Sequence, residues 1–326
     1  MQQSKEERSI EQLTKELKKG PEHWNIGGAY GGFQLVTAAK AALDDLGVEG
    51  ISFTVFDMHF GMKWAGGRPH AFAAGQTKET FARLVHEYNR RGIQFNLVFS
   101  NLFVDRQHLG DKRCNWLLEH CQRPGNGVIV TSHVLAQYIR ENFPEYRLVH
   151  SLTHFNKDPA YYYDLKGLYD VFVLPPHLNY RTPVLQEMLE ELGPERIEIL
   201  VNETCFRECN IRREHYELIS KANLEEDWDL WEQLSNGYCQ HAHAERFIRI
   251  EEASNVRRIK NFTLSQEEVD NLKALGIRNF KLANRQVPNQ QYAKWMDYYL
   301  FDRLGLSTTL YIYENYYKPA TYFAGR

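Results

Sequence analysis

The chain has 326 residues, of which 43% are hydrophobic and 25% charged, values of an ordinary globular protein. Its net charge of −3 at pH 7 excludes a general affinity for polyanions, so we do not expect nucleic acid as a structural partner. Net charge does not exclude a local basic groove, because it says nothing about how the charges are distributed. The first twenty residues lack the apolar stretch of a secretory signal, and no window has the ~18 consecutive apolar residues of a membrane helix. We therefore expect a cytoplasmic protein whose five cysteines are thiols or metal ligands rather than disulfides.

Short apolar runs alternate with helical segments along the chain. An amphipathic helix over residues 4–19 comes first, and Gly20 and Pro21 end it. The predicted strands lie within 24–32 and at 51–56, 93–99, 128–130, 146–149, 171–174, 197–201 and 279–282. The predicted helices that follow them lie at 35–46, 78–91, through Cys114 and Cys121, at 134–141, around 160–167, at 183–192 and at 290–304.

This alternation predicts a parallel sheet with right-handed crossovers. Eight repeats in a chain of this length favour a closed (β/α)8 barrel of the TIM type, and a doubly wound open sheet is the alternative. We divide the chain into an N-terminal helix (1–22), the barrel (23–305) and an aromatic tail (306–326) that is expected to add an accessory strand. The connection between the seventh and eighth strands, residues 205–278, is much longer than the others and is predicted to be a functional insertion.

Polar residues follow several predicted strands, and the carboxyl ends of barrel strands form a shared rim where active sites lie. Glu203 follows the seventh strand and is interpreted either as a general acid or base or as the cap of a helix beginning at Cys205. Asp57 and His59 follow the second strand and are further catalytic candidates. The candidates for holding a polar substrate are Arg68, Asn101, His177, Asn179, Asn202 and Arg285.

Three cysteines form the candidate metal site. Cys205 and Cys209 are four residues apart, a spacing that places both on one side of the first turn of a helix, and Cys239 lies in the insertion. Three thiolates suit a four-iron cluster with one open iron, or a zinc ion with one open position, and plain thiols are the alternative. His241 and His243 follow Cys239 and are interpreted as a ligand or proton relay, or as an exposed pair in a polar loop. No Walker loop, GxGxxG, GxSxG or HExxH pattern occurs in the sequence.

Three stretches resemble the barrel domain of the collagenase-like peptidase family: Val173–Asn179, Leu200–Cys205 with the following Arg212–Tyr216, and Gly276–Arg285. The resemblance covers roughly residues 90–290. It implies a (β/α)8-like barrel and, by comparison with the iron–sulfur branch of the family, a [4Fe–4S] cluster. That branch uses four cysteines, whereas this chain offers Cys205, Cys209 and Cys239 at different spacings.

The resemblance and the residues together favour an iron–sulfur enzyme that acts on a polar small molecule, an amide or a modified nucleobase. The reaction expected at the cluster is an oxygenation, a sulfur transfer or a rearrangement, with a separate redox partner protein. A metal-free peptidase of the type that the family name suggests is the second hypothesis. A non-catalytic partner protein is the third.

Overall fold

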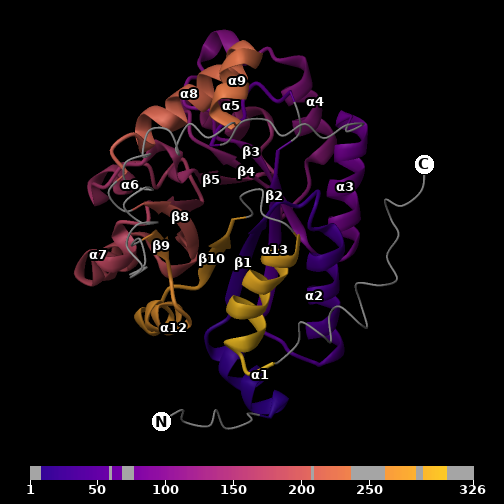
Figure 1. The fold of residues 1–326 in the computed structure, drawn as a ribbon, viewed down its shortest axis with the longest axis vertical. Coiled ribbons are helices and arrows are strands. Elements are labelled where there is room, and N and C mark those ends of the chain that lie inside the picture. The colour runs from indigo at the N-terminus through magenta and orange to yellow at the C-terminus, as the bar shows by residue number, and fades with distance from the viewer. Residues whose placement is uncertain are drawn as a thin grey trace, which may run out of the picture.

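The protein is a closed barrel of eight parallel strands, seen in a computed structural model that describes residues 9–58, 61–67, 77–206, 209–235, 261–283 and 289–306 (Figure 1). The strands pair in the order β1-β10-β7-β6-β5-β4-β3-β2 around the barrel. Their bounds are β1 (Glu22–Gly27), β2 (Ile51–Asp57), β3 (Gln94–Phe99), β4 (Gly127–Val130), β5 (Arg147–His150), β6 (Val171–Leu174), β7 (Ile197–Leu200) and β10 (Asn279–Leu282). The predicted (β/α)8 architecture is confirmed, and the eight strands lie within a few residues of their predicted positions.

Helices follow the strands along the chain. They are α2 (Phe33–Asp45), α3 (Lys78–Arg90), α4 (Lys112–Cys121), α5 (His133–Asn142), α6 (Pro159–Asp164), α7 (Thr182–Leu192) and α13 (Asn289–Met296), which continues as a π-helix, η5 (Asp297–Asp302). The N-terminal helix α1 (Ile10–Lys19) lies at the bottom of Figure 1. Side-chain caps fix several of these starts: the Ser132 hydroxyl accepts the backbone N–H of Leu135 at the start of α5, for example. A large apolar core fills the space between the helices and the outer face of the barrel.

The strand register defines which side chains point into the barrel. In parallel strands, paired residues point the same way, so Asn25 on β1 and its partners Thr54 on β2 and Lys281 on β10 share the interior. Continuing the pairing around the barrel adds Asn96 on β3 and Glu198 on β7. The barrel interior is therefore partly polar, whereas the interior of a (β/α)8 barrel is usually filled by branched aliphatic side chains.

The long connection after β7 forms its own substructure. It contains β8 (Asn202–Phe206), α8 (Arg212–Glu225), α9 (Trp228–Ser235), β9 (Asn261–Thr263) and α12 (Gln266–Leu275). Strands β8 and β9 pair antiparallel, with Glu203 opposite Phe262. The prediction that a helix begins at Cys205 was wrong, because residues 202–206 find backbone partners sixty residues later and remain extended. Glu203 consequently does not cap a helix there.

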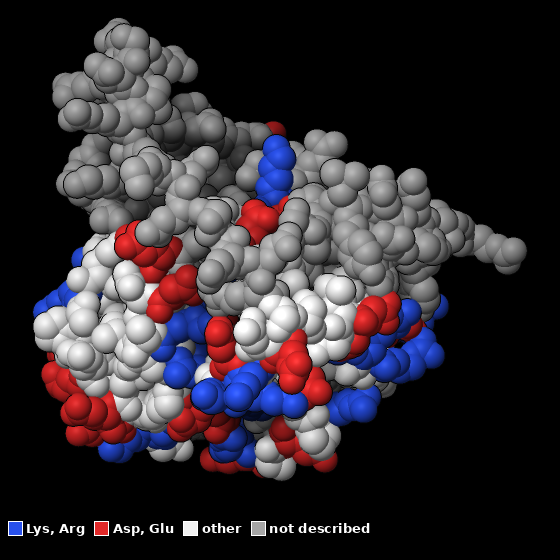
Figure 2. Space-filling model, turned by 90° about the horizontal axis from the view of Figure 1, so that it is seen from below, with Lys and Arg blue, Asp and Glu red and all other residues white. Residues whose placement is uncertain are grey.

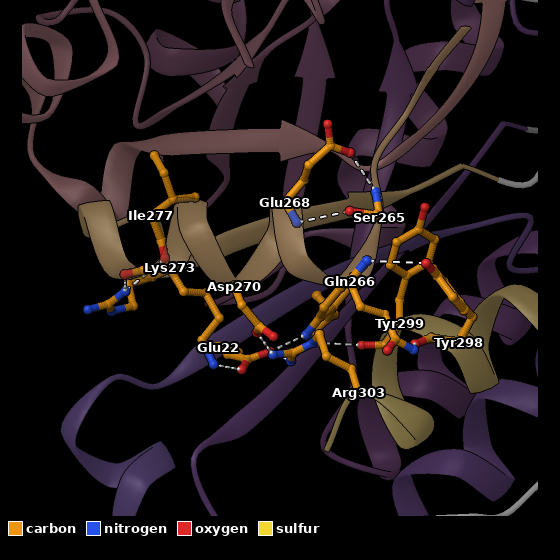
Figure 3. A network of polar contacts seen from close by, with 12 residues as sticks. Glu22, Ser265, Gln266, Glu268, Asp270, Lys273, Ile277, Tyr298, Tyr299 and Arg303 are labelled. Atoms are coloured by element: carbon orange, nitrogen blue, oxygen red, sulfur yellow. Dashed lines mark hydrogen bonds and ion pairs between the residues drawn. The ribbon is translucent and has the colours of Figure 1, made fainter. Parts of the chain in front are cut away.

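At the amino end of the barrel, Glu22 of β1 is buried among cationic groups (Figure 3). Its carboxylate pairs with Lys273 of α12 and with Arg303, which directly follows η5. Arg303 also contacts Asp270 at 2.9 Å, and the indole N–H of Trp24 donates to Glu22 at 3.0 Å. This network ties the last described helices to the first strand.

The described surface carries mixed charge. On the face shown in Figure 2, Lys and Arg side chains are interspersed with Asp and Glu. None of the described helices is long and apolar enough to cross a membrane. The predicted accessory strand in the tail lies almost entirely in residues 307–326, outside the described part, and the predicted domain boundaries stay predictions.

Candidate functional site at the mouth of the barrel

A chain of polar side chains crosses the barrel interior. The Lys281 ammonium lies 3.2 Å from Glu198 Oε1, and the Asn25 amide donates to both Glu198 oxygens at 3.1 and 3.2 Å. The Asn96 amide extends the chain to Asn25 Oδ1 at 3.4 Å. Gly127 makes room for Asn96, since a Cβ atom there would lie 2.3 Å from Asn96 Oδ1. All four polar residues are buried, and a buried ion pair with this desolvation cost is weak evidence for stability.

The Lys281 ammonium lies over the ring of Phe56, 3.9 Å from its centroid, at the carboxyl end of β2. A carboxylate and an aromatic face both favour the charged form of an amine. Lys281 is therefore held between the Glu198 carboxylate and the Phe56 ring. Around it, the carboxyl half of the interior is apolar and includes Val173, Leu200 and Tyr216.

Tyr216 belongs to α8, so the insertion covers the mouth of the barrel. Helix α8 is held there by amides that bond to backbone atoms. Asn101, which follows β3, donates to the carbonyl of Ser220 at 2.7 Å and also to those of Lys63 and Ala65. Asn223 of α8 donates to Ala65 at 3.0 Å and accepts the indole N–H of Trp231 in α9. Helices α8 and α9 lie together at the top of Figure 1.

Arg212, the first residue of α8, brings a second cation to the mouth. Its guanidinium lies over the ring of Phe155 at 4.8 Å and over that of Phe262 at 4.9 Å. His177, which follows β6, contacts the same two rings edge-on at 5.2 and 4.5 Å. The predicted residue His177 thus lies beside a buried arginine in an aromatic setting.

Hydroxyl groups line the rim where β3, β4 and β5 end. Thr131 and Thr153 share a hydrogen bond of 2.7 Å, and Thr153 lies 3.1 Å from Ser151. The Ser100 hydroxyl donates to the carbonyl of Gly66 at 2.9 Å. An added Cβ at Gly66 would lie 2.4 Å from the Ser100 carbonyl oxygen, so the residue must be glycine for the loop to pack here.

The other predicted residues are distributed as follows. Asn202 bridges the exits of β7 and β10, because its amide donates to Ala283 O at 2.7 Å and its oxygen accepts Ala283 N–H at 2.8 Å. Glu203 is buried and accepts the backbone N–H of Cys205 at 2.9 Å. Asp57 accepts the N–H groups of Tyr30 and Met58, both at 2.9 Å, and Asn179 donates to Leu200 O at 3.4 Å. His59, Arg68, Arg285 and Cys239, together with His241 and His243, lie outside the described residues.

In the structure Asn101, His177, Asn179, Asn202 and Glu203 all follow the carboxyl ends of barrel strands. Their roles in binding or catalysis stay predictions. Sequence analysis missed Lys281, Glu198 and Arg212. Lys281 and Glu198 lie inside buried strands, where a polar residue appears in the sequence only as an interruption of an apolar run.

The comparisons with known proteins agree with this architecture. No protein-family model matches the chain. It is 24% identical over 174 residues to a protein of Methanocaldococcus jannaschii named an uncharacterized protease, a match that covers 52% of each chain. The solved structure of the U32 peptidase Mk0906 matches 82% of this chain and 94% of that one, with a TM-score of 0.51 and 15% identity, which shows a common fold. The chain is therefore similar in sequence to this archaeal protein and shares the barrel fold of a U32, or collagenase-like, peptidase. It spans about half the length of the curated relative.

The four cysteines in the described part of the chain divide into two classes. Cys114 and Cys121 are fully buried in α4, and burial raises the pKa of the Cys121 thiol to about 12 and that of Cys114 well above its usual range. Cys205 and Cys209 are only partly buried, at the mouth. Because thiolates are the reactive and metal-binding form, the raised pKa values make the first pair inert.

The donor set at the mouth fits an iron–sulfur cluster in part. Cysteine thiolates are the usual ligands of such clusters. In the described ranges, however, no group of three or more His, Cys, Asp or Glu side chains is arranged to hold a metal. Cys205 and Cys209 therefore need at least Cys239 to complete a site.

Proposed function

We propose that the chain is an iron–sulfur-dependent enzyme of the collagenase-like peptidase family that acts at the mouth of the barrel. Its substrate is a polar small molecule, an amide or a modified nucleobase. The separation of the cysteines into a buried pair and a mouth pair supports this proposal most directly, because the partly buried mouth pair follows a barrel strand on the side where barrel enzymes carry out their chemistry.

The residues have distinct tasks in this proposal. Cys205, Cys209 and Cys239 hold the cluster, which supplies an open iron or an electron when bound. Glu203, buried beside Cys205, holds or transfers a proton. Arg212 and Lys281 provide positive charge next to the apolar wall of the mouth, and α8 restricts the access of water. A separate redox protein supplies electrons.

Anaerobic purification tests the cluster. The wild-type protein should be brown, should contain iron and acid-labile sulfide, and should show a thiolate-to-iron absorbance band. Cys205→Ala should lose the colour and the iron, whereas Cys121→Ala, the matched control, should keep both because Cys121 is buried in α4. A colourless, iron-free wild-type preparation would contradict the proposal, and so would a Cys205→Ala variant with full iron content.

A metal-free peptidase is the second candidate, and the name of the M. jannaschii relative favours it. In that case Glu203 alone would carry the acid–base chemistry. A screen of peptide substrates would then find turnover that Glu203→Gln abolishes and Cys239→Ala leaves unchanged. Loss of turnover in both variants would instead support the cluster-dependent function.

A further inference from the structure

Three histidines and two tyrosines form a hydrogen-bonded cluster behind the rim at β4 and β5. The Tyr161 hydroxyl of α6 lies between two imidazoles, 3.2 Å from His133 Nε2 and 3.1 Å from His150 Nε2. His133 Nδ1 lies 2.9 Å from the Tyr169 hydroxyl. His154 stacks on the Tyr161 ring with centroids 4.8 Å apart. These contacts connect α5, β5, α6 and the short 3-10 helix η2 (Leu152–His154).

The surroundings of the three histidines favour uncharged imidazoles. The three histidine rings lie 6.1–6.2 Å apart, and the aromatic rings of Tyr162, Tyr169 and Phe172 surround His150. Tyr161, Tyr162 and Tyr169 are themselves titratable, but burial raises the pKa of each above its usual range, so they stay neutral. The charged group that acts on the cluster from α8 is Arg213, which opposes a positive charge on His154. None of the described Asp and Glu side chains forms an ion pair with these imidazoles.

Burial lowers the pKa of His133, His150 and His154, and each positive charge would further disfavour the others. The buried Nδ1 of His150 has no hydrogen-bond partner among the described residues, so a proton added there would be poorly stabilised. His133 is half-buried and His154 is exposed, so these two can meet protons from solvent. Two charges about 6 Å apart, with no ion pair to a carboxylate of the described residues, would oppose the closed arrangement.

The same segment connects the cluster to the mouth. Strand β5 ends at His150, η2 carries Thr153 of the hydroxyl rim and His154, and Phe155 follows directly. Phe155 is in the left-handed conformation, at φ 55° and ψ 34°, which a bulky residue adopts only when its surroundings impose it. Its ring covers the guanidinium of Arg212 and contacts His177. The position of Phe155 at the mouth thus depends on how firmly η2 is held from behind.

We propose that this cluster is a pH-sensitive latch on the mouth. With all three imidazoles neutral, the Tyr169–His133–Tyr161–His150 chain and the His154–Tyr161 stack hold η2, and Phe155 covers Arg212. Protonation of His133 and His154 in mild acid releases η2 and Phe155 and opens that side of the mouth. The folded-state pKa values lie below the ordinary value of about 6.5, so the closed form is fully stabilised above that pH and loses stability as the pH falls below it. This inference does not depend on iron or on the proposed reaction.

Hydrogen exchange of the full-length protein, followed by mass spectrometry at pH 7.5 and pH 5.5 and corrected for intrinsic exchange, tests the latch. In wild type, peptides covering residues 150–158 should exchange about tenfold faster or more at pH 5.5, whereas peptides of α3 should not change. The His133→Gln/His154→Gln double variant should lose this pH dependence. His86→Gln, which changes an exposed histidine of α3, should keep it.

Equal protection of residues 150–158 at both pH values in wild type would overturn the latch. So would a double variant with the full wild-type pH response, or acceleration in α3 equal to that in 150–158, which would indicate global unfolding. Tyr161→Phe is the second variant if the double variant does not fold. It keeps the ring that stacks on His154 but removes the hydroxyl link, so residues 150–158 should already exchange fast at pH 7.5, and wild-type protection there would contradict the proposal.

Discussion

Replacing Glu22 by glutamine tests the buried charge network at the amino end of the barrel (Figure 3). The change keeps the size of the side chain but leaves Arg303, with 2% of its side chain exposed, without its main counter-charge. Removing one partner of a buried pair in this way costs roughly 3–5 kcal/mol, because the other charge remains buried. For a chain of this size that corresponds to a fall in Tm of about 5–10 °C.

The measurement is urea unfolding followed by circular dichroism, with thermal unfolding as a second probe. The matched control is Asp44→Asn, the same carboxylate-to-amide change in the more exposed Lys40–Asp44 pair of α2, for which we expect a loss below about 1 kcal/mol. A Glu22→Gln variant no less stable than Asp44→Asn would refute the interpretation that this network holds α12 and η5 to the barrel.

The pKa of Glu22 determines how the stability lost in Glu22→Gln changes with pH. Burial alone would raise the pKa of Glu22, but the charges and hydrogen bonds of Arg303 and Lys273 outweigh it and hold the pKa below its usual value. The stabilisation is therefore fully present above the ordinary glutamate pKa of about 4.5 and is lost as the pH falls through the lower folded-state value. The difference in stability between wild type and Glu22→Gln should stay constant from pH 8 to about pH 5 and close in stronger acid. A difference that instead grows in acid would mean that the pKa is raised.

Two further substitutions probe the mouth and the interior. Gly66→Ala should destabilise the protein by about 1–3 kcal/mol in urea unfolding, because the new Cβ would clash with the Ser100 carbonyl. The control, Gly110→Ala, should change stability by less than about 0.5 kcal/mol, because no atom lies within 4 Å of its new Cβ. Lys281→Met should cost about 3–5 kcal/mol in urea unfolding, because Glu198 would remain buried without its ion-pair partner. The double variant Glu198→Leu/Lys281→Met should be close to wild type in stability, because it removes both charges. A double variant as unstable as Lys281→Met would show that the ion pair itself is needed for folding.

The barrel was predictable because local pattern and global fold agree. The strands are short apolar-rich runs, most are followed directly by a helix, and eight parallel strands alternating with helices favour a closed barrel. Strand β8 was not predictable by the same reasoning. Its partner, residues 261–263, lies sixty residues away, and nothing within 202–209 distinguishes a strand end from the start of a helix. Pairing between segments so far apart cannot be predicted from the local sequence pattern.

The position of the polar residues at the strand ends does not by itself define their role. Asn101 and Asn202 lie on the rim, but their amides bond to backbone groups, that of Asn101 to Ser220 of α8 and that of Asn202 to Ala283 after β10. By contrast, Lys281 and Glu198 lie inside strands, where a polar residue first reads as an interruption of the apolar pattern. Recognising them required the register, which places them in the same interior.

These assignments change where substrate contacts are to be sought. An amide that already donates to a carbonyl of the cover must give up that bond to hold a ligand, and a buried group pays for a lost partner with its full desolvation cost. Asn101 is tied in this way to Ser220 of α8, and Asn202 to Ala283. The cations at the mouth lie against aromatic rings: Arg212 contacts two phenyl rings, and Lys281, which also pairs with Glu198, lies over a third. The physical division is therefore between asparagines that fasten the insertion to the barrel and cations that lie against aromatic rings at its mouth.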